Sequence, residues 1–283
     1  MKKLLALSTA LFISTLVGFG QSKPTTGTAA TTPTTATSTV KKDTATIVKK
    51  DTSSAAMATK KDVVTVDSVF ARYFKATGGV ALWDSMETYT MKRSYRSNSS
   101  ADYDAEIFVS MADQAMSKSK IILKRNFIYG VKGNDGWLKI PLGSYDKVTK
   151  YQVKDLSQPE QENMRLEMYD LLVPFIDYKD RGLVATLVGT EKMDSTNVYQ
   201  VELQNKAVKY NLFFDVKTGL LLRERETSGT EIITTDFGKY VKSKFGILYP
   251  SALISTSSKD KTKVAITSEL MVNEKINPEL FKR

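Results

Sequence analysis

The sequence predicts a mainly β protein of the α+β class, with a strongly curved antiparallel sheet or half-open barrel of about 9–11 strands and a helix across its mouth. Two observations predict this fold. From Met86 onward, apolar and polar side chains alternate with the period of two that marks half-buried strands. One amphipathic helical stretch interrupts the strands near the middle of the chain. A curved sheet crossed by a helix buries both kinds of apolar face.

Residues 1–21 have the order of a secretory signal peptide. Lys2 and Lys3 precede an apolar run that ends in small residues, and we expect cleavage near Gln21. A periplasmic protein is the expected product, with an uncleaved anchor as the alternative. The chain has no cysteine, so we expect neither a lipid-modified cysteine nor a disulfide.

Residues 22–62 are rich in Thr, Ala, Ser, Pro and Lys and have almost no large apolar side chain. Such a segment cannot offset the entropy of ordering its backbone, which predicts a disordered tether. Its recurring lysine pairs are either simply solvated or touch anionic lipid head groups, an attraction of about 1 kcal/mol per lysine near such a surface. Peripheral membrane contact therefore stays open, and so does glycosylation of the threonines.

The formal net charge of +10 is concentrated at the start of the chain. Nine lysines and three aspartates fall within residues 1–62, which leaves the folded domain, residues 63–283, nearly balanced. Together with export, this balance argues against a nucleic-acid partner.

The folded domain is expected to begin with two helices. Asp67 is predicted to cap the first, in which Val69, Phe70, Tyr73 and Phe74 recur at helical spacing. Two glycines at 78–79 end this helix. A second, short helix is expected over residues 80–86.

About nine to eleven antiparallel strands are expected, from eleven apolar or alternating runs. A turn of composition Gly-Asn-Asp-Gly at 133–136 and a hairpin turn at 215–219 separate some of them. The runs lie at residues 89–95, 107–111, 121–123, 127–129, 137–140, 198–203, 210–214, 220–222, 233–237, 252–254 and 264–270.

The helical stretch between the two groups of strands begins with a predicted capping box of Ser157 and Glu160. We expect it to end at Pro174 and Gly182. Its apolar stripe consists of Met164, Met168, Leu171, Leu172 and Phe175. Such a stripe is either plain core or, because methionine repacks around varied shapes, the wall of an adaptable apolar groove.

The chain has no histidine and no cysteine, which excludes Ser-His-Asp and Cys-His catalysis and nearly all zinc and haem sites. No phosphate-binding glycine motif is present. Asp135, Asp215 and Asp236 are candidate carboxylates for glycoside hydrolysis, but each lies in or beside a predicted turn, where aspartate is common. We expect no catalytic residue, no metal site and no cofactor.

Four motifs, in their order and spacing, resemble the outer-membrane lipoprotein carrier superfamily of LolA-like and LolB-like proteins, especially exported relatives in Bacteroidetes-type bacteria. They are Ala-Arg-Tyr-Phe-Lys-Ala-Thr-Gly-Gly at 71–79, Gly-Asn-Asp-Gly-Trp at 133–137, Phe-Asp-Val-Lys-Thr-Gly-Leu-Leu at 214–221 and Ile-Asn-Pro-Glu-Leu-Phe at 276–281. Together they span most of residues 65–283. This resemblance implies a half-open barrel with a helical lid over an apolar cavity.

The resemblance also implies site residues. In the carrier, an arginine on a strand bonds the lid and keeps it shut, and either Arg93 or Arg125 matches that role here. The apolar stripe of the helix would form the lid. The cavity wall would then consist of Met91, Phe127, Tyr129, Trp137, Leu212 and Phe214.

The leading hypothesis is a monomeric, non-catalytic carrier in the envelope that binds a lipid, an acyl chain or a lipoprotein-like apolar ligand. The alternative is a module whose filled cavity or sheet docks onto another envelope protein. A carboxylate-type hydrolase is the third. An open cavity of several hundred cubic ångströms would favour the carrier.

Overall fold

The computed structural model of the chain describes residues 63–143 and 150–283. The predicted signal peptide and tether lie outside these residues. The helices are α1 (Val66–Ala76), α2 (Val80–Asp84), α3 (Gln158–Asp170) and the short 3-10 helix η2 (Pro278–Phe281). Within the described ranges, no helix combines the length and the apolar character needed to cross a membrane.

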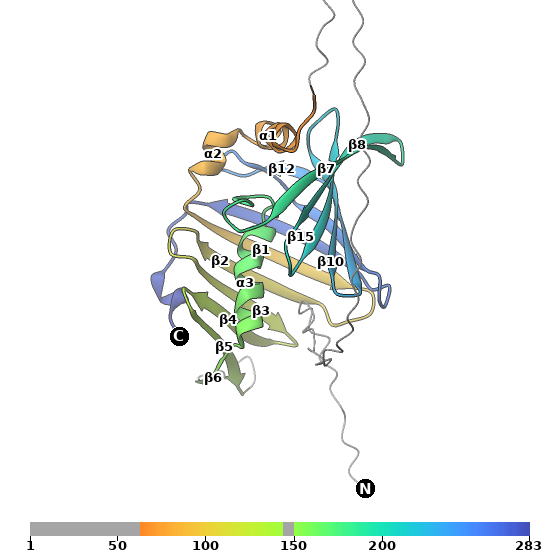
Figure 1. The fold of residues 1–283 in the computed structure, drawn as a ribbon. Helices are drawn as coiled ribbons and strands as arrows, with labels where there is room; N and C mark the ends of the chain where they lie inside the picture. The colour runs from red at the N-terminus through yellow and green to blue at the C-terminus, as the bar shows by residue number, and fades with distance from the viewer. Residues whose placement is uncertain (1–62, 144–149) are drawn as a thin grey trace, which may run out of the picture. The chain divides into compact units, whose positions relative to one another are not determined.

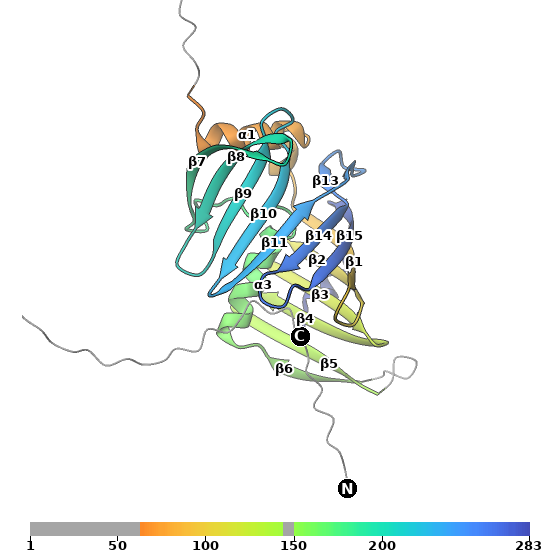
Figure 2. The same ribbon diagram turned by 90° about the vertical axis from the view of Figure 1, so that its right-hand side faces the viewer.

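About half of the described residues form one antiparallel sheet of thirteen strands, in the order β6-β5-β4-β3-β2-β1-β15-β14-β11-β10-β9-β8-β7. The sheet is strongly curved but not closed, because β6 and β7 are its two edges (Figures 1 and 2). Its strands are β1 (Thr88–Ser97), β2 (Tyr103–Ser110), β3 (Ala115–Ile122), β4 (Arg125–Lys132), β5 (Asp135–Leu142), β6 (Lys150–Asp155), β7 (Val184–Met193), β8 (Thr196–Gln204), β9 (Lys209–Asp215), β10 (Leu221–Ser228), β11 (Glu231–Phe237), β14 (Ala252–Ser257) and β15 (Lys263–Val272). The predicted curved, half-open sheet is confirmed.

The predicted number of strands was too low. With the separate two-stranded ribbon of β12 (Tyr240–Lys242) and β13 (Leu248–Pro250), the described residues form fifteen strands. The four unpredicted strands are this ribbon and the two edges, β6 and β7. Every residue of β6 is exposed, so no buried face distinguishes it in the sequence, and the ribbon strands have only three residues each.

A single pairing joins the two ends of the domain. β1 to β6 follow one another as neighbours, and so do β7 to β11, while β1 pairs with β15 in the middle of the sheet. Tyr89 thereby lies opposite Val272. Asn273 strengthens this seam, since its side-chain oxygen accepts hydrogen bonds from the backbone N–H groups of Glu87 and Thr88 at 2.9 and 3.1 Å.

Helix α1 is capped by Thr65, not by Asp67 as predicted. The Thr65 side chain accepts from the backbone N–H of Ser68, and the Ser68 hydroxyl accepts from the backbone N–H of Thr65, which forms a reciprocal capping box. Asp67 lies in the first turn instead, where its carboxylate accepts from the Tyr178 hydroxyl and pairs with Lys179. A carboxylate at that position also favours the helix dipole.

The ring of Phe175 lies at the centre of an aromatic cluster that joins α1 to β9. It stacks on Phe70 at 4.4 Å between centroids and lies within 5.1 to 5.5 Å of Tyr73, Phe74 and Phe214. Such pairs add about 0.5–1.5 kcal/mol each beyond the burial of their area. The protein's own aromatic side chains therefore pack closely around Phe175.

Helix α3 has the predicted capping box of Ser157 and Glu160, but it ends at Asp170 instead of continuing to Pro174. Leu171 is its C-cap, and Leu172 to Phe175 lie in the turns that follow. A proline disfavours helical backbone in the residue before it and has no N–H to continue the helix, so the chain leaves the helix early. The predicted stripe therefore divides between the helix and the turns.

We expect Phe175→Ala to lower the free energy of unfolding by about 3–5 kcal/mol, because the ring is 2% exposed and removing it leaves a cavity among four aromatic neighbours. Urea denaturation followed by circular dichroism measures the change. Val184→Ala is the control, since Val184 is 64% exposed and its truncation should change stability by less than about 0.5 kcal/mol. Equal effects of the two substitutions on the free energy of unfolding would contradict a central role of Phe175 in the aromatic cluster.

Candidate ligand-binding site beneath helix α3

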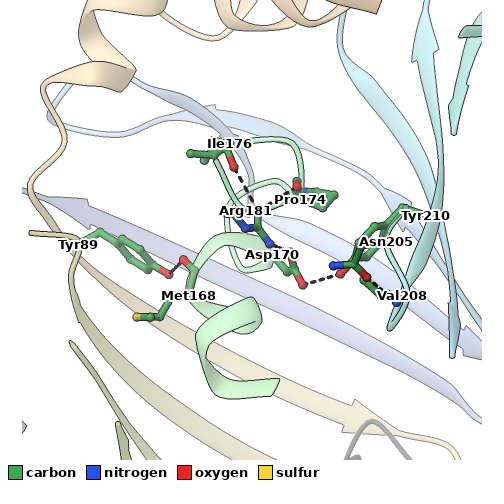
Figure 3. A network of polar contacts seen from close by, with 9 residues as sticks. All are labelled: Tyr89, Met168, Asp170, Pro174, Ile176, Arg181, Asn205, Val208 and Tyr210. Atoms are coloured by element: carbon green, nitrogen blue, oxygen red, sulfur yellow. Dashed lines mark hydrogen bonds and ion pairs between the residues drawn. The ribbon is translucent and has the colours of Figure 1, made fainter. Parts of the chain in front are cut away.

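Helix α3 crosses the face of the sheet that we call the inner face (Figure 1). Two side chains of β1 hold its C-terminal half. The Tyr89 hydroxyl donates to the carbonyl oxygen of Met168 at 2.6 Å, and the Arg93 guanidinium donates to that of Leu171 at 2.9 Å. Tyr89 and Met168 can be followed in Figure 3. Because helix-terminal carbonyls lack partners within the helix, these bonds satisfy groups that would otherwise be buried without one.

Of the two predicted latch residues, only Arg93 contacts the helix in this structure. The guanidinium of Arg125 donates instead to the carbonyl oxygen of Pro141 on β5 at 2.7 Å and lies over the ring of Phe127. Whether Arg93 acts as a latch stays a prediction.

A polar network beyond the end of α3 fixes the connection to β7 (Figure 3). The Asp170 carboxylate accepts from the Tyr210 hydroxyl at 2.8 Å and from Arg181 at 3.3 Å. Arg181 also donates to the carbonyl oxygens of Pro174 and Ile176 at 3.0 and 3.1 Å. Burial raises the pKa of Asp170 to about 6, although Arg181 acts to lower it.

Two cavities lie along α3 on the inner face. The larger has a volume of about 280 Å³ and is lined by α3, β3, β4, β9 and β10. The smaller, of about 240 Å³, extends toward β1, β2 and β15. Four residues border both cavities, namely Lys118, Lys120, Glu167 and Glu226. The lining of the larger cavity is mixed, since Leu156, Met164, Val208 and Tyr129 face these charges.

The charges beneath α3 are only partly paired. Lys118 of β3 forms an ion pair with Glu167 of α3. Burial raises the pKa of Glu167, but the charges of Lys118 and Lys120 outweigh it and bring the pKa below its usual value. Glu226 of β10 is half-buried and forms no ion pair or hydrogen bond within residues 63–143 and 150–283. Burial and then the charge of Asp170 raise its pKa to about 7.

The predicted site residues lie in five different places, four on the inner side of the sheet and one, that of Trp137, on its outer face. Met164 and Tyr129 line the 280 Å³ cavity. Leu172 and Phe175 border a separate 590 Å³ pocket against α1 and α2. Phe127 is half-buried on β4 beside Arg125. The remaining inner-face residues belong to the buried core, namely Met91, Met168, Leu171, Leu212 and Phe214.

Trp137 lies on the opposite, outer face of the sheet. It pairs with Gly130, the neighbour of Tyr129, and side chains of successive strand residues point to opposite faces. A Cβ atom at Gly130 would lie 2.2 Å from the indole ring, so glycine is needed for this packing. Trp137 is therefore buried away from both cavities.

The charged residues of the cavities were not predicted as site residues. Lys118 and Lys120 alternate with serines on β3, and a polar strand segment usually indicates a solvent-facing surface. Two lysines two residues apart share one face, and Met116 precedes them on it. Their position on the same face as Met116 was the one feature of the sequence that could have indicated that these lysines point into the interior. Among the described residues, no group of carboxylates is arranged to hold a metal ion.

The fold and the site together define a half-barrel with a helix over a partly charged interior cavity. The sequence matches no protein-family model and no curated protein. Among solved structures, a DUF1329 family protein from Desulfovibrio piger has a TM-score of 0.51 at 14% identity, over 76% of this chain and 97% of that one. A putative outer membrane lipoprotein-sorting protein domain from Vibrio parahaemolyticus has a TM-score of 0.47 at 12% identity, and the match covers 76% of this chain and 94% of that one. At 14% identity, the likeness to the Desulfovibrio piger protein is one of fold alone.

We expect Arg93→Met to loosen the C-terminal half of α3. A hydrogen bond from a charged donor contributes about 1.5–3 kcal/mol, so its loss should speed hydrogen exchange of the Leu171 and Leu172 amides at least about tenfold. Hydrogen exchange followed by mass spectrometry or NMR measures this. Arg125→Met is the matched control and should leave these amides unchanged. Similar acceleration in both variants would contradict a specific role of Arg93.

We expect Glu226→Gln to stabilise the domain at high pH only. The pKa of Glu226 is about 7 in the folded state, whereas a glutamate in the unfolded chain has a pKa of about 4. The free energy of unfolding therefore falls as the pH rises from about 4 to about 7. The variant should exceed the wild type by about 1–3 kcal/mol above pH 7 and equal it near pH 4. Exposed Glu191→Gln should show no such dependence in the same urea denaturation series. A gain in the free energy of unfolding that is independent of pH would contradict the raised pKa of Glu226.

Proposed function

We propose that this protein is an exported, non-catalytic carrier that shelters the apolar part of a ligand beneath α3. The observation that carries this proposal is the 280 Å³ cavity between α3 and the inner face of the sheet, with a second cavity of 240 Å³ beside it. Each is near the lower end of the range for ligand pockets. A ligand with a long chain would occupy both or displace α3.

The attachment of α3 supports movement of this kind. Its contacts with the sheet include several individual polar bonds, from Tyr89, Arg93, Lys118 and Arg165. Each such bond contributes only about 1–3 kcal/mol net. The aromatic cluster around Phe175, by contrast, anchors the connection after α3. Helix α3 could thus move while the connection stays in place, although such movement would also expose Met164 and Met168, which are buried.

The carboxylates considered for hydrolysis have other roles in the structure, which supports a non-catalytic function. Asp215 accepts from the backbone N–H of Lys217 at 2.7 Å and shapes a hairpin turn. Asp236 forms an ion pair with Arg223. By strand alternation, Asp135, Asp215 and Asp236 lie on the outer face, opposite the cavities.

A second candidate function is docking of another envelope protein onto an edge of the sheet. Strand β6 pairs on one side only and is exposed along its whole length, with Tyr151 and Val153 among its apolar side chains. An unpaired edge can accept an additional strand through main-chain hydrogen bonds. This alternative requires no ligand in the cavities.

Binding of a dansyl-labelled fatty acid tests the carrier proposal. We expect saturable binding to the wild type and at least about tenfold weaker binding to Ser228→Phe, which places a ring in the 280 Å³ cavity. Thr227→Phe is the control, because Thr227 is the next residue on β10 and points to the outer face. It should bind within about twofold of the wild type. No binding to the wild type, or equal loss in both variants, would overturn the proposal.

A further inference from the structure

Lys120 is a buried lysine in the interior of the half-barrel. It lies on β3 and is 8% exposed. Its side chain borders both the 280 Å³ and the 240 Å³ cavity and therefore lies between them. Buried lysines are rare unless a charged partner accompanies them.

Lys120 has no such partner in the described part of the chain, where its amine forms neither a hydrogen bond nor an ion pair. Glu167 of α3, which borders the same two cavities, is bound to Lys118. The Lys120 amine lies instead between two aromatic rings, at 5.4 Å from the centroid of Tyr103 and 5.5 Å from that of Tyr129. Cation–π contacts of this kind offset only part of the cost of removing an ammonium group from water.

The environment of Lys120 consequently disfavours its positive charge. Burial and then the charge of Lys118 lower the pKa of its amine to about 7, although Glu167 acts to raise it. The pKa of Glu226, which lies on β10 across the cavity, is also raised to about 7, so its carboxyl group stays protonated below that pH. An anion placed beside the amine would supply the missing partner and favour the protonated form.

We propose that Lys120 binds the anionic head group, a carboxylate or a phosphate, of an amphipathic ligand whose chain occupies the cavities beneath α3. This inference rests on the proposed carrier function and adds the polarity of the ligand to it. The amine binds the head group between the cavities, while Leu156, Met164 and Val208 contact the apolar chain. The protonated carboxyl of Glu226 can donate a second hydrogen bond to the same anion.

The test compares three ligands of equal chain length, dodecanoate, dodecyl phosphate and dodecanol, by calorimetric titration of the full chain. We expect the wild type to bind one or both anions at least about tenfold more tightly than the alcohol, since a hydrogen bond to a charged group contributes about 1.5–3 kcal/mol. The stronger of the two anions identifies the head group as a carboxylate or a phosphate.

Substitutions of Lys120 then assign the preference to its amine. Lys120→Met should bind all three ligands with affinities within about twofold of one another, while Lys120→Arg should keep the preference for anions. Lys92→Met is the matched control, because Lys92 lies on β1, is half exposed and pairs with Glu106 on the outer face. It should behave as the wild type. Thermal denaturation confirms that each variant is folded.

The outcomes separate the two proposals. Equal binding of the three ligands by the wild type would overturn the head-group inference and leave the carrier function intact. Retention of the preference by folded Lys120→Met would overturn it as well. Binding of none of the three ligands by the wild type would overturn the carrier function itself. If Lys120→Met does not fold, two measurements still test the head-group inference, namely the preference of the wild type for anions over the alcohol and the same preference in Lys120→Arg. Loss of this preference in folded Lys120→Arg would contradict the inference.

Discussion

The open sheet imposes the main constraint on this structure. A sheet with one apolar face and two unpaired edges must have that face covered, and here the chain segment between the edges provides the cover. The segment leaves β6 at one edge, crosses the inner face as α3 and enters β7 at the other edge. Because it is attached at both ends, α3 stays over the sheet even where the space beneath it is not filled.

The side chains between this segment and the sheet differ in polarity along its length. Next to α1, the aromatic cluster around Phe175 forms part of the hydrophobic core and borders the 590 Å³ pocket. Beneath the middle of α3, charged groups replace apolar ones, and the pairing of Lys118 with Glu167 satisfies only some of them. A buried ion pair is weak evidence for stability, because desolvation offsets much of its attraction. The distribution of polarity thus distinguishes an aromatic end of the half-barrel from a charged end.

The sequence predicted those features that depend on local patterns. The period of two located the central strands, the Ser157 and Glu160 box located the start of α3, and the inward position of Arg93 was visible on β1. Features that depend on tertiary neighbours were not predictable in this way. Strand β6 has no buried face to detect, and Lys120 on a strand resembles a surface lysine until the register places it opposite Ala105 and Phe127. The carbonyl that Arg93 contacts depends on where α3 crosses the sheet.

The seam between β1 and β15 has a consequence for how the chain reaches its native state. Each half of the sheet is a series of neighbouring hairpins, whose contacts are close in sequence and form quickly. The contact that joins the halves connects Tyr89 with Val272 and closes a loop of almost the whole domain. Loop closure of this length is entropically costly and slows folding. The domain therefore cannot complete its sheet until the last strand has been synthesised, and a nascent chain stopped before β15 would expose both unpaired halves.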